Sequence, residues 1–99
     1  MINPNRYNNR DDNEPELVAI AEAMGHEWFE GGPLDGWINL MGRWVPVEVK
    51  NPKGRNRKQP SQVEFMETCD ANSWPCFTWN NEHDVITSIN QFVTRHSRY

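Results

Sequence analysis

Apolar and polar residues alternate along two neighbouring stretches of this chain. The apolar positions repeat every second residue and are Ile38, Leu40, Val45, Val47 and Val49. This period is typical of β-strands that turn one face toward a core. Met41-Gly42 separates the two stretches, and a two-residue connection favours a tight antiparallel turn. The pattern therefore predicts a β-hairpin.

The register of this hairpin places charged residues close together. If Leu40 pairs with Arg43, the same register sets Asp35 opposite Glu48. Opposed residues have Cβ atoms about 4.5–5.5 Å apart, and like charges at that distance are destabilising. A divalent cation such as Mg²⁺, which takes carboxylate, water and phosphate oxygens, would compensate. Lys50 lies two residues beyond Glu48 and so is expected on the same face.

Pro46 restricts where the second hairpin strand can lie. Proline donates no hydrogen bond to a ladder, so we expect Pro46 at a sheet edge or a β-bulge. A bulge, or a three-residue loop, would shift the register by one residue.

Helical periodicity and cap signals predict three helices around the strands. Asn13 is expected to cap the first helix, and Pro15 fits its first turn. The expected elements are a helix at 14–24, strands at 26–29, 35–40 and 43–50, a helix at 60–71, a strand at 75–79 and a helix at 83–94. Their order is α-β-β-β-α-β-α, with a right-handed parallel crossover between the last two strands. The sequence thus predicts an α/β fold with a mixed β-sheet flanked by helices.

Length and composition favour one domain. The 99 residues suffice for a single core at 13–99, after a polar stretch at 1–12 that we expect to be a flexible tail. No apolar run of about 18 residues and no signal-peptide pattern is present, so we expect a cytoplasmic protein. We interpret Cys69 and Cys76 as reduced structural thiols, with a disulfide or zinc role as the alternatives.

The charge is unevenly distributed. The net charge is -4, yet residues 50–58 contain no acid and carry half of the ten basic residues: Lys50, Lys53, Arg55, Arg57 and Lys58. A local basic segment suits a phosphate backbone, whatever the mean charge. The alternative is a solvated loop.

Four segments, in this order, resemble the PD-(D/E)XK nuclease superfamily. More narrowly, they are similar to small stand-alone virus-type replication-repair nuclease (VRR-NUC) domains, often encoded by phages and prophages. The segments are Asn13-Glu14-Pro15-Glu16-Leu17-Val18, Gly31-Gly32-Pro33-Leu34-Asp35, Gly42-Arg43-Trp44-Val45-Pro46-Val47-Glu48-Val49-Lys50 and Pro60-Ser61-Gln62-Val63-Glu64-Phe65. One departure is that Leu34 separates Pro33 from Asp35, which the family pattern has adjacent. The resemblance implies a restriction-endonuclease-like core.

The resemblance also implies a metal site. Asp35, Glu48 and the carbonyl of Val49 would bind Mg²⁺ or Mn²⁺, and Lys50 would orient the attacking water and stabilise charge on the phosphate. The alternatives are a turn-capping Asp35, a cross-strand surface Glu48 and a solvated Lys50.

Two further positions complete the implied site. Gln62 would contact the water, the metal shell or the phosphate, although a glutamine in a first helical turn can instead cap the helix. An acid of the first helix would be Glu16, with Glu14 as the alternative; favourable interaction with the helix dipole explains either.

Trp37 and Trp44 would stack on a splayed base or, as we favour, pack against a helix. Lys53, Arg55, Arg57 and Lys58 would bind DNA phosphates.

The expected function is that of a metal-dependent DNA endonuclease that leaves a 5′-phosphate. Small stand-alone relatives favour branched DNA such as four-way junctions, which implies a homodimer with one site per strand. One or two metals per site are both compatible with the sequence. The alternatives are a catalytically silent DNA-binding or assembly module with a nuclease fold, and another nuclease class such as a restriction or RNA-cleaving enzyme.

Overall fold

The computed structural model describes residues 13–51 and 59–96. The elements are α2 (Glu14–Ala23), β1 (Glu27–Glu30), β2 (Gly36–Leu40), β3 (Arg43–Val49), α3 (Pro60–Ala71), β4 (Phe77–Trp79) and α4 (Glu82–His96). Their order is the predicted one, and each boundary lies within a few residues of its expected place. The tail expected at 1–12 and the basic residues Lys53, Arg55, Arg57 and Lys58 lie outside the described residues.

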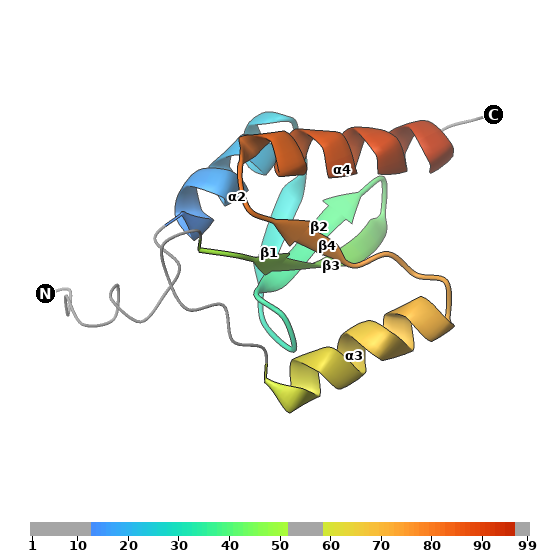
Figure 1. The fold of residues 1–99 in the computed structure, drawn as a ribbon. Coiled ribbons are helices and arrows are strands. Elements are labelled where there is room, and N and C mark those ends of the chain that lie inside the picture. The colour runs from blue at the N-terminus through green and yellow to red at the C-terminus, as the bar shows by residue number, and fades with distance from the viewer. Residues whose placement is uncertain (1–12, 52–58, 97–99) are drawn as a thin grey trace, which may run out of the picture.

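The described strands form one mixed sheet between two helical layers. The strand order is β1-β2-β3-β4, with β1–β2 and β2–β3 antiparallel and β3–β4 parallel. Helices α2 and α4 cover one face, and α3 lies on the other (Figure 1). The mixed α/β fold and the parallel crossover from β3 through α3 to β4 are as predicted.

The hairpin has the register predicted from its turn. Leu40 pairs with Arg43, and the ladder continues to Gly36 opposite Val47. Met41 and Gly42 have φ angles of 59° and 84°. A type I′ turn needs positive φ at both of its central residues, and these two supply them. The Gly42 N–H also donates to the side-chain oxygen of Asn39 at 2.8 Å.

Pro46 lies inside β3, and the ladder accommodates it without a bulge between residues 36 and 47. Main-chain groups of alternate residues point to opposite neighbours. The Val47 carbonyl points toward the β2 side, where it accepts the Asp35 N–H. The ring nitrogen of Pro46 therefore points toward the β4 side, where pairing begins only at Val47 with Phe77. At Pro46, β3 pairs with a described strand on the β2 side alone. Pro46 therefore lies at a local sheet edge, as expected.

The core lies between the sheet and the layer of α2 and α4. The hairpin residues predicted to face inward are all buried there, joined by Leu17, Ala21, Phe77, Trp79, Val85, Ile89 and Phe92. Trp79 is fully buried, and its indole N–H donates to the hydroxyl of Ser88 at 2.9 Å. This contact joins β4 to α4.

Helix α3 is less deeply packed than its sequence pattern predicts. The apolar residues that recur along this helix are Val63, Phe65, Met66 and Cys69. Only Cys69 is buried, while Val63 is 39% exposed. Phe65 contacts Trp37 edge-on, with ring centroids 6.0 Å apart. The helix thus covers the second face of the sheet through few side chains.

Within the described residues, no helix combines the length and apolar character needed to cross a membrane.

Candidate metal and phosphate site

Asp35 lies at the start of β2 and interacts with the backbone of β3. The prediction that Asp35 directly opposes Glu48 needs correction, because the ladder ends at Gly36 and the Asp35 N–H donates to the Val47 carbonyl at 3.0 Å. Its carboxylate takes the place of the next backbone hydrogen bond of the ladder, because Oδ2 accepts the Val49 N–H at 2.7 Å. Asp35 therefore lies beside the segment that carries Glu48 and Lys50, one step away from the predicted pairing.

Glu48 is a buried acid with a nearby cation. Its side chain is on the face of the sheet opposite the core, and the residue is only 6% exposed. Lys50 Nζ lies 3.7 Å from Glu48 Oε2. A direct charge-assisted hydrogen bond would be shorter, at about 2.7–2.9 Å. The two groups therefore attract one another without tight contact. In the β3–β4 ladder, Thr78 is the neighbour of Glu48.

The carbonyl of Val49 points to the same side as Asp35. In a strand, the N–H and C=O of one residue point to the same neighbour. Since the Val49 N–H is bound by Asp35, its carbonyl projects past the end of β2 on that side. Two carboxylates and one main-chain carbonyl are therefore available at this end of the hairpin.

Asn13 joins the start of α2 to the end of β3. We predicted a side-chain cap, but Asn13 makes no such hydrogen bond. Its amide instead donates to the carbonyls of Lys50, at 2.8 Å, and Asn80, at 3.4 Å. Its side-chain oxygen is buried and accepts no hydrogen bond from the described part of the chain. An unused acceptor is thus present beside Lys50.

Of the two candidate acids in α2, the structure buries Glu14 and exposes Glu16. Glu14 is 4% exposed and lies next to Asn13, hence near the end of β3. Glu16 lies on the solvent side of the helix, so the preference for Glu16 is not supported by its position. The signal was in the sequence, because position 14 shares the helical face of the buried Leu17 and Ala21.

Gln62 caps α3 and also contacts the turn before Asp35. Its side-chain oxygen accepts the Gln59 N–H at 3.2 Å. This bond is the one that the capping interpretation predicted. The amide nitrogen of Gln62 donates to the carbonyl of Pro33 at 3.4 Å. The start of α3 is thereby placed beside the candidate site, and a contact of Gln62 with water or phosphate stays a prediction.

The tryptophans of the hairpin pack rather than stand free. Trp37 contacts Phe65 of α3 and donates its indole N–H to the carbonyl of Gly32 at 3.3 Å. Trp44 remains 41% exposed and meets Phe29 edge-on, at 6.3 Å between centroids. Packing against a helix, the favoured interpretation, holds for Trp37.

Both cysteines are free thiols, and Cys76 lies near enough to Glu48 to interact with its charge. Burial raises the pKa of the Cys76 thiol to about 12, with smaller contributions from the neighbouring Cys69 and from Glu48. Cys76 therefore stays neutral and weakly nucleophilic at physiological pH.

The donor atoms at this site fit a hard divalent cation. Within residues 13–51 and 59–96, no group of three or more His, Cys, Asp or Glu side chains is placed to bind a metal ion together. The set formed by Asp35, Glu48 and the Val49 carbonyl contains only oxygen, with two carboxylates. Mg²⁺ typically binds through one or two carboxylates plus water and phosphate oxygen, so the chemistry of these donors matches that ion.

No protein-family model, curated protein or solved structure matches this chain.

Proposed function

We propose that this protein is a metal-dependent DNA endonuclease with a PD-(D/E)XK core, similar to the VRR-NUC domains. The supporting observation is the hydrogen bond of Asp35 to the N–H of Val49, the residue between Glu48 and Lys50. It places the acid of the glycine-rich turn against the Glu-x-Lys segment, as the resemblance implies. Asp35, Glu48 and the Val49 carbonyl would hold Mg²⁺ or Mn²⁺.

The chain itself supplies a fixed charge for hydrolysis. A bound divalent cation would lower the pKa of water and offset charge on the phosphate. Lys50, held near Glu48, would orient the attacking water and stabilise charge developing on the phosphate oxygens. Attack in line would leave a 5′-phosphate.

Two helix starts would complete the site. Glu14, buried at the start of α2, replaces Glu16 as the preferred acid of the first helix. Gln62, fixed by Gln59 and Pro33, would contact the water or the phosphate from α3. Both positions lie beside the Asp35 turn or the Lys50 end of β3.

The substrate proposed is branched DNA, including four-way junctions. The sequence places Lys53, Arg55, Arg57 and Lys58 directly after Lys50, where they would bind phosphates flanking the cut. Cutting two strands of a junction needs two sites, which a symmetric pair of chains would supply. A cytoplasmic protein encoded by a phage or prophage would have access to such DNA.

One observation favours a second candidate, a catalytically silent DNA-binding module. The Lys50 ammonium already offsets the charge of Glu48, so this acid does not require a cation for compensation. The nuclease proposal and this alternative differ in whether phosphodiester bonds are cut.

A cleavage assay separates the two candidates. Purified protein would be incubated with a four-way junction, a flap, a single strand and a linear duplex, in Mg²⁺, Mn²⁺ or EDTA. Lys50→Ala and Asp35→Asn would be tested beside Glu22→Gln, a matched control at an exposed acid of α2. Circular dichroism would establish that each variant is folded.

We expect metal-dependent cutting by the wild type and by Glu22→Gln, with a loss of at least about 100-fold in folded Lys50→Ala and Asp35→Asn. Metal-independent binding of the junction without cutting would support the silent module. Equal cutting by all four proteins would place the activity outside this site.

A further inference from the structure

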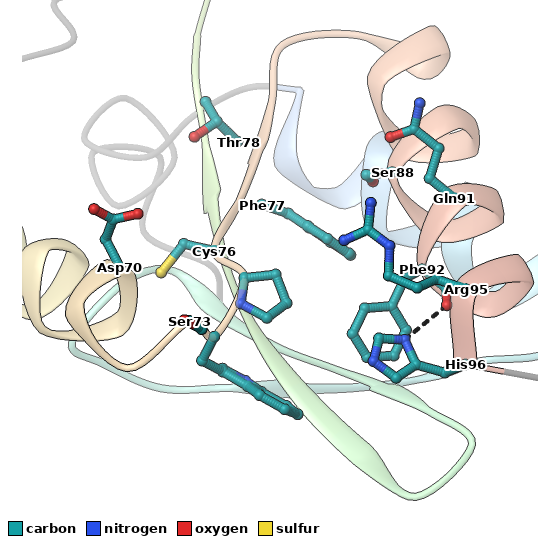
Figure 2. Close-up of a pocket in the computed structure, with 12 residues that line it drawn as sticks. Asp70, Ser73, Cys76, Phe77, Thr78, Ser88, Gln91, Phe92, Arg95 and His96 are labelled. Atoms are coloured by element: carbon teal, nitrogen blue, oxygen red, sulfur yellow. Dashed lines mark hydrogen bonds between the residues drawn. The ribbon is translucent and has the colours of Figure 1, made fainter.

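A cavity lies along the open edge of the described sheet. It has a volume of about 580 Å³. This volume is within the range of small-molecule pockets. The cavity extends from the turn after α3, past β4, to the last two turns of α4 (Figure 2). Since β4 is the last strand of the described sheet, no further described strand covers this edge.

Fixed aromatic rings line the cavity. The indole N–H of Trp74 donates a hydrogen bond to the Trp44 carbonyl at 3.2 Å. The Trp74 ring also contacts the Phe92 ring edge-on, with centroids 6.3 Å apart. His96 stacks on Phe92 with centroids 4.1 Å apart, and its Nδ1 lies 3.0 Å from the Phe92 carbonyl oxygen. Trp74, which is exposed, and His96, which is half-buried, both line the cavity, so part of each side chain is accessible to a ligand.

The positively and negatively charged side chains of the cavity lie at opposite ends. Arg95 lines the α4 wall beside His96, and Asp70 lines the opposite end, on α3 (Figure 2). In the described part of the chain, no ion pair or hydrogen bond engages the Arg95 guanidinium. A cation therefore lies at one end of the ring-lined space and a hydrogen-bond acceptor at the other.

The cavity reaches the strand next to the candidate site. Thr78 lines it, and Thr78 is the ladder neighbour of Glu48. The open edge thus runs from the Glu48 region toward Arg95. A strand of nucleic acid held at Asp35 and Glu48 could follow this edge along β4.

We propose that this cavity binds one unpaired nucleotide of the DNA strand whose phosphodiester lies at the Asp35–Glu48 site. The base stacks on the aromatic wall, as bases of unpaired strands do on aromatic side chains. The phosphate contacts Arg95, and Asp70 accepts a hydrogen bond from an exocyclic amino group. This inference rests on the proposed nuclease function and makes unpaired DNA beside the cut the preferred substrate.

The test is a nuclear magnetic resonance titration of the ¹⁵N-labelled full chain with deoxycytidine 5′-monophosphate in EDTA. We expect shifts of the Trp74 indole N–H and of amides around Phe77 and His96. In Arg95→Ala the affinity falls about tenfold, which corresponds to one charge-assisted contact. Arg43→Ala is the matched control, because Arg43 is an exposed arginine next to the hairpin turn, and it binds like the wild type.

Absence of these shifts at millimolar nucleotide, or equal affinity in Arg95→Ala and Arg43→Ala, overturns the proposal. Cavity shifts that depend on protein concentration alone also overturn it, because they assign the edge to a second copy of the chain. The titration needs no catalysis, so it can succeed where the cleavage assay fails. If wild type and Arg95→Ala cut DNA with and without unpaired nucleotides equally, the nuclease function stands and this inference fails.

Discussion

At the scale of single residues, Asp35 has two separable roles. Its carboxylate completes the β-ladder by accepting the Val49 N–H, and it is also a proposed cation ligand. A backbone N–H without a partner costs about 1–3 kcal/mol when buried. The structural role needs only an acceptor oxygen, whereas the cation role needs negative charge.

We therefore predict that Asp35→Ala lowers the free energy of unfolding by about 1–3 kcal/mol, while Asp35→Asn lowers it by less than half as much. Urea unfolding of the three proteins in EDTA measures both changes. Equal destabilisation by the two variants would mean that the charge, not the hydrogen bond, stabilises this turn.

Cys76 provides a second residue-scale prediction. Its thiol pKa is raised from 9.0 to about 12, chiefly by burial. The folded state therefore keeps this proton after the unfolded chain has lost it. The associated stability is present below the ordinary pKa of 9.0 and is lost as the pH rises toward about 12.

We predict that iodoacetamide modifies Cys76 in the folded protein at least about tenfold more slowly than in urea at pH 9, because the thiolate is the nucleophile. Peptide mass spectrometry resolves Cys76 from Cys69. A rate in the folded protein equal to that in urea would contradict the burial argument.

The placement of the candidate residues could be predicted only in part at this scale, because Asp35 lies beside the Glu48–Lys50 segment but not directly opposite Glu48, and because one contact is long-range. Asp35, Glu48 and Lys50 follow from strand period and turn length, both of which are short-range. Asn13 could not be assigned, because its amide bonds to carbonyls that lie far away in the sequence. Such long-range hydrogen bonds leave no periodic signal.

At the scale of elements, β2 begins with a close contact. Gly36 lies under the Trp28 indole, and a Cβ at this position would lie 2.7 Å from Cε2 and 2.8 Å from Cη2. Trp28 in turn packs on Trp79, with centroids 5.7 Å apart. The first residue of β2 is therefore small because the Trp28 indole, which packs on Trp79, occupies the space beside it.

We predict that Gly36→Ala destabilises the fold by about 1–3 kcal/mol through overpacking and alters the near-ultraviolet circular dichroism of the tryptophans. Gly32→Ala is the control, since nothing lies within 4 Å of its added Cβ. Thermal melts with a melting temperature of Gly36→Ala equal to that of Gly32→Ala would refute the contact.

Asp84, in the first turn of α4, accepts hydrogen bonds from Asn80, the residue that follows β4. Its Oδ2 accepts both the backbone N–H and the side-chain amide of Asn80 at 2.9 Å, and the side-chain bond is the main cause that lowers the Asp84 pKa. Because the pKa of Asp84 is lower in the folded state, its ionised carboxylate stabilises the fold at pH values above the ordinary pKa of 3.8. This stabilisation is lost as the pH falls through the pKa of the folded state.

We predict that wild-type stability in urea drops as the pH falls from about 6 to about 3, and that Asp84→Asn removes part of this drop. Glu82→Gln, at an exposed acid of the same first turn, serves as the control. An identical pH dependence in Asp84→Asn and wild type would exclude Asp84 as a contributor.

Elements with strong periodicity could be predicted from the sequence. For α3 the position along the chain could be predicted, but its packing could not. The hairpin alternation fixes both strands and their inward faces, because packing on one side imposes the period. For α3 the start and length were correct, but Val63 stayed exposed. How closely a helix approaches a sheet depends on partners such as Trp37, which helical periodicity does not identify.

At the scale of the whole molecule, the ends of several elements meet at one place. The Gly31–Asp35 turn, the end of β3, the start of α2 and the start of α3 are joined by the hydrogen bonds of Asp35, Asn13 and Gln62. The cavity along β4 is lined by Thr78, the ladder neighbour of Glu48, and extends to Arg95 and His96 of α4 (Figure 2). A cation and a DNA strand would therefore be bound by elements that the fold already holds together.

We propose that Asp35 and Glu48 bind a divalent cation together. Isothermal titration calorimetry with Mn²⁺ would compare wild type, Asp35→Asn, Glu48→Gln and the control Glu22→Gln, each shown to be folded. We predict Mn²⁺ binding to wild type and Glu22→Gln, and at least about tenfold weaker binding to each of the other two variants, because each loses a carboxylate ligand. Mn²⁺ binding of equal strength in all four proteins, or in none of them, would contradict the account.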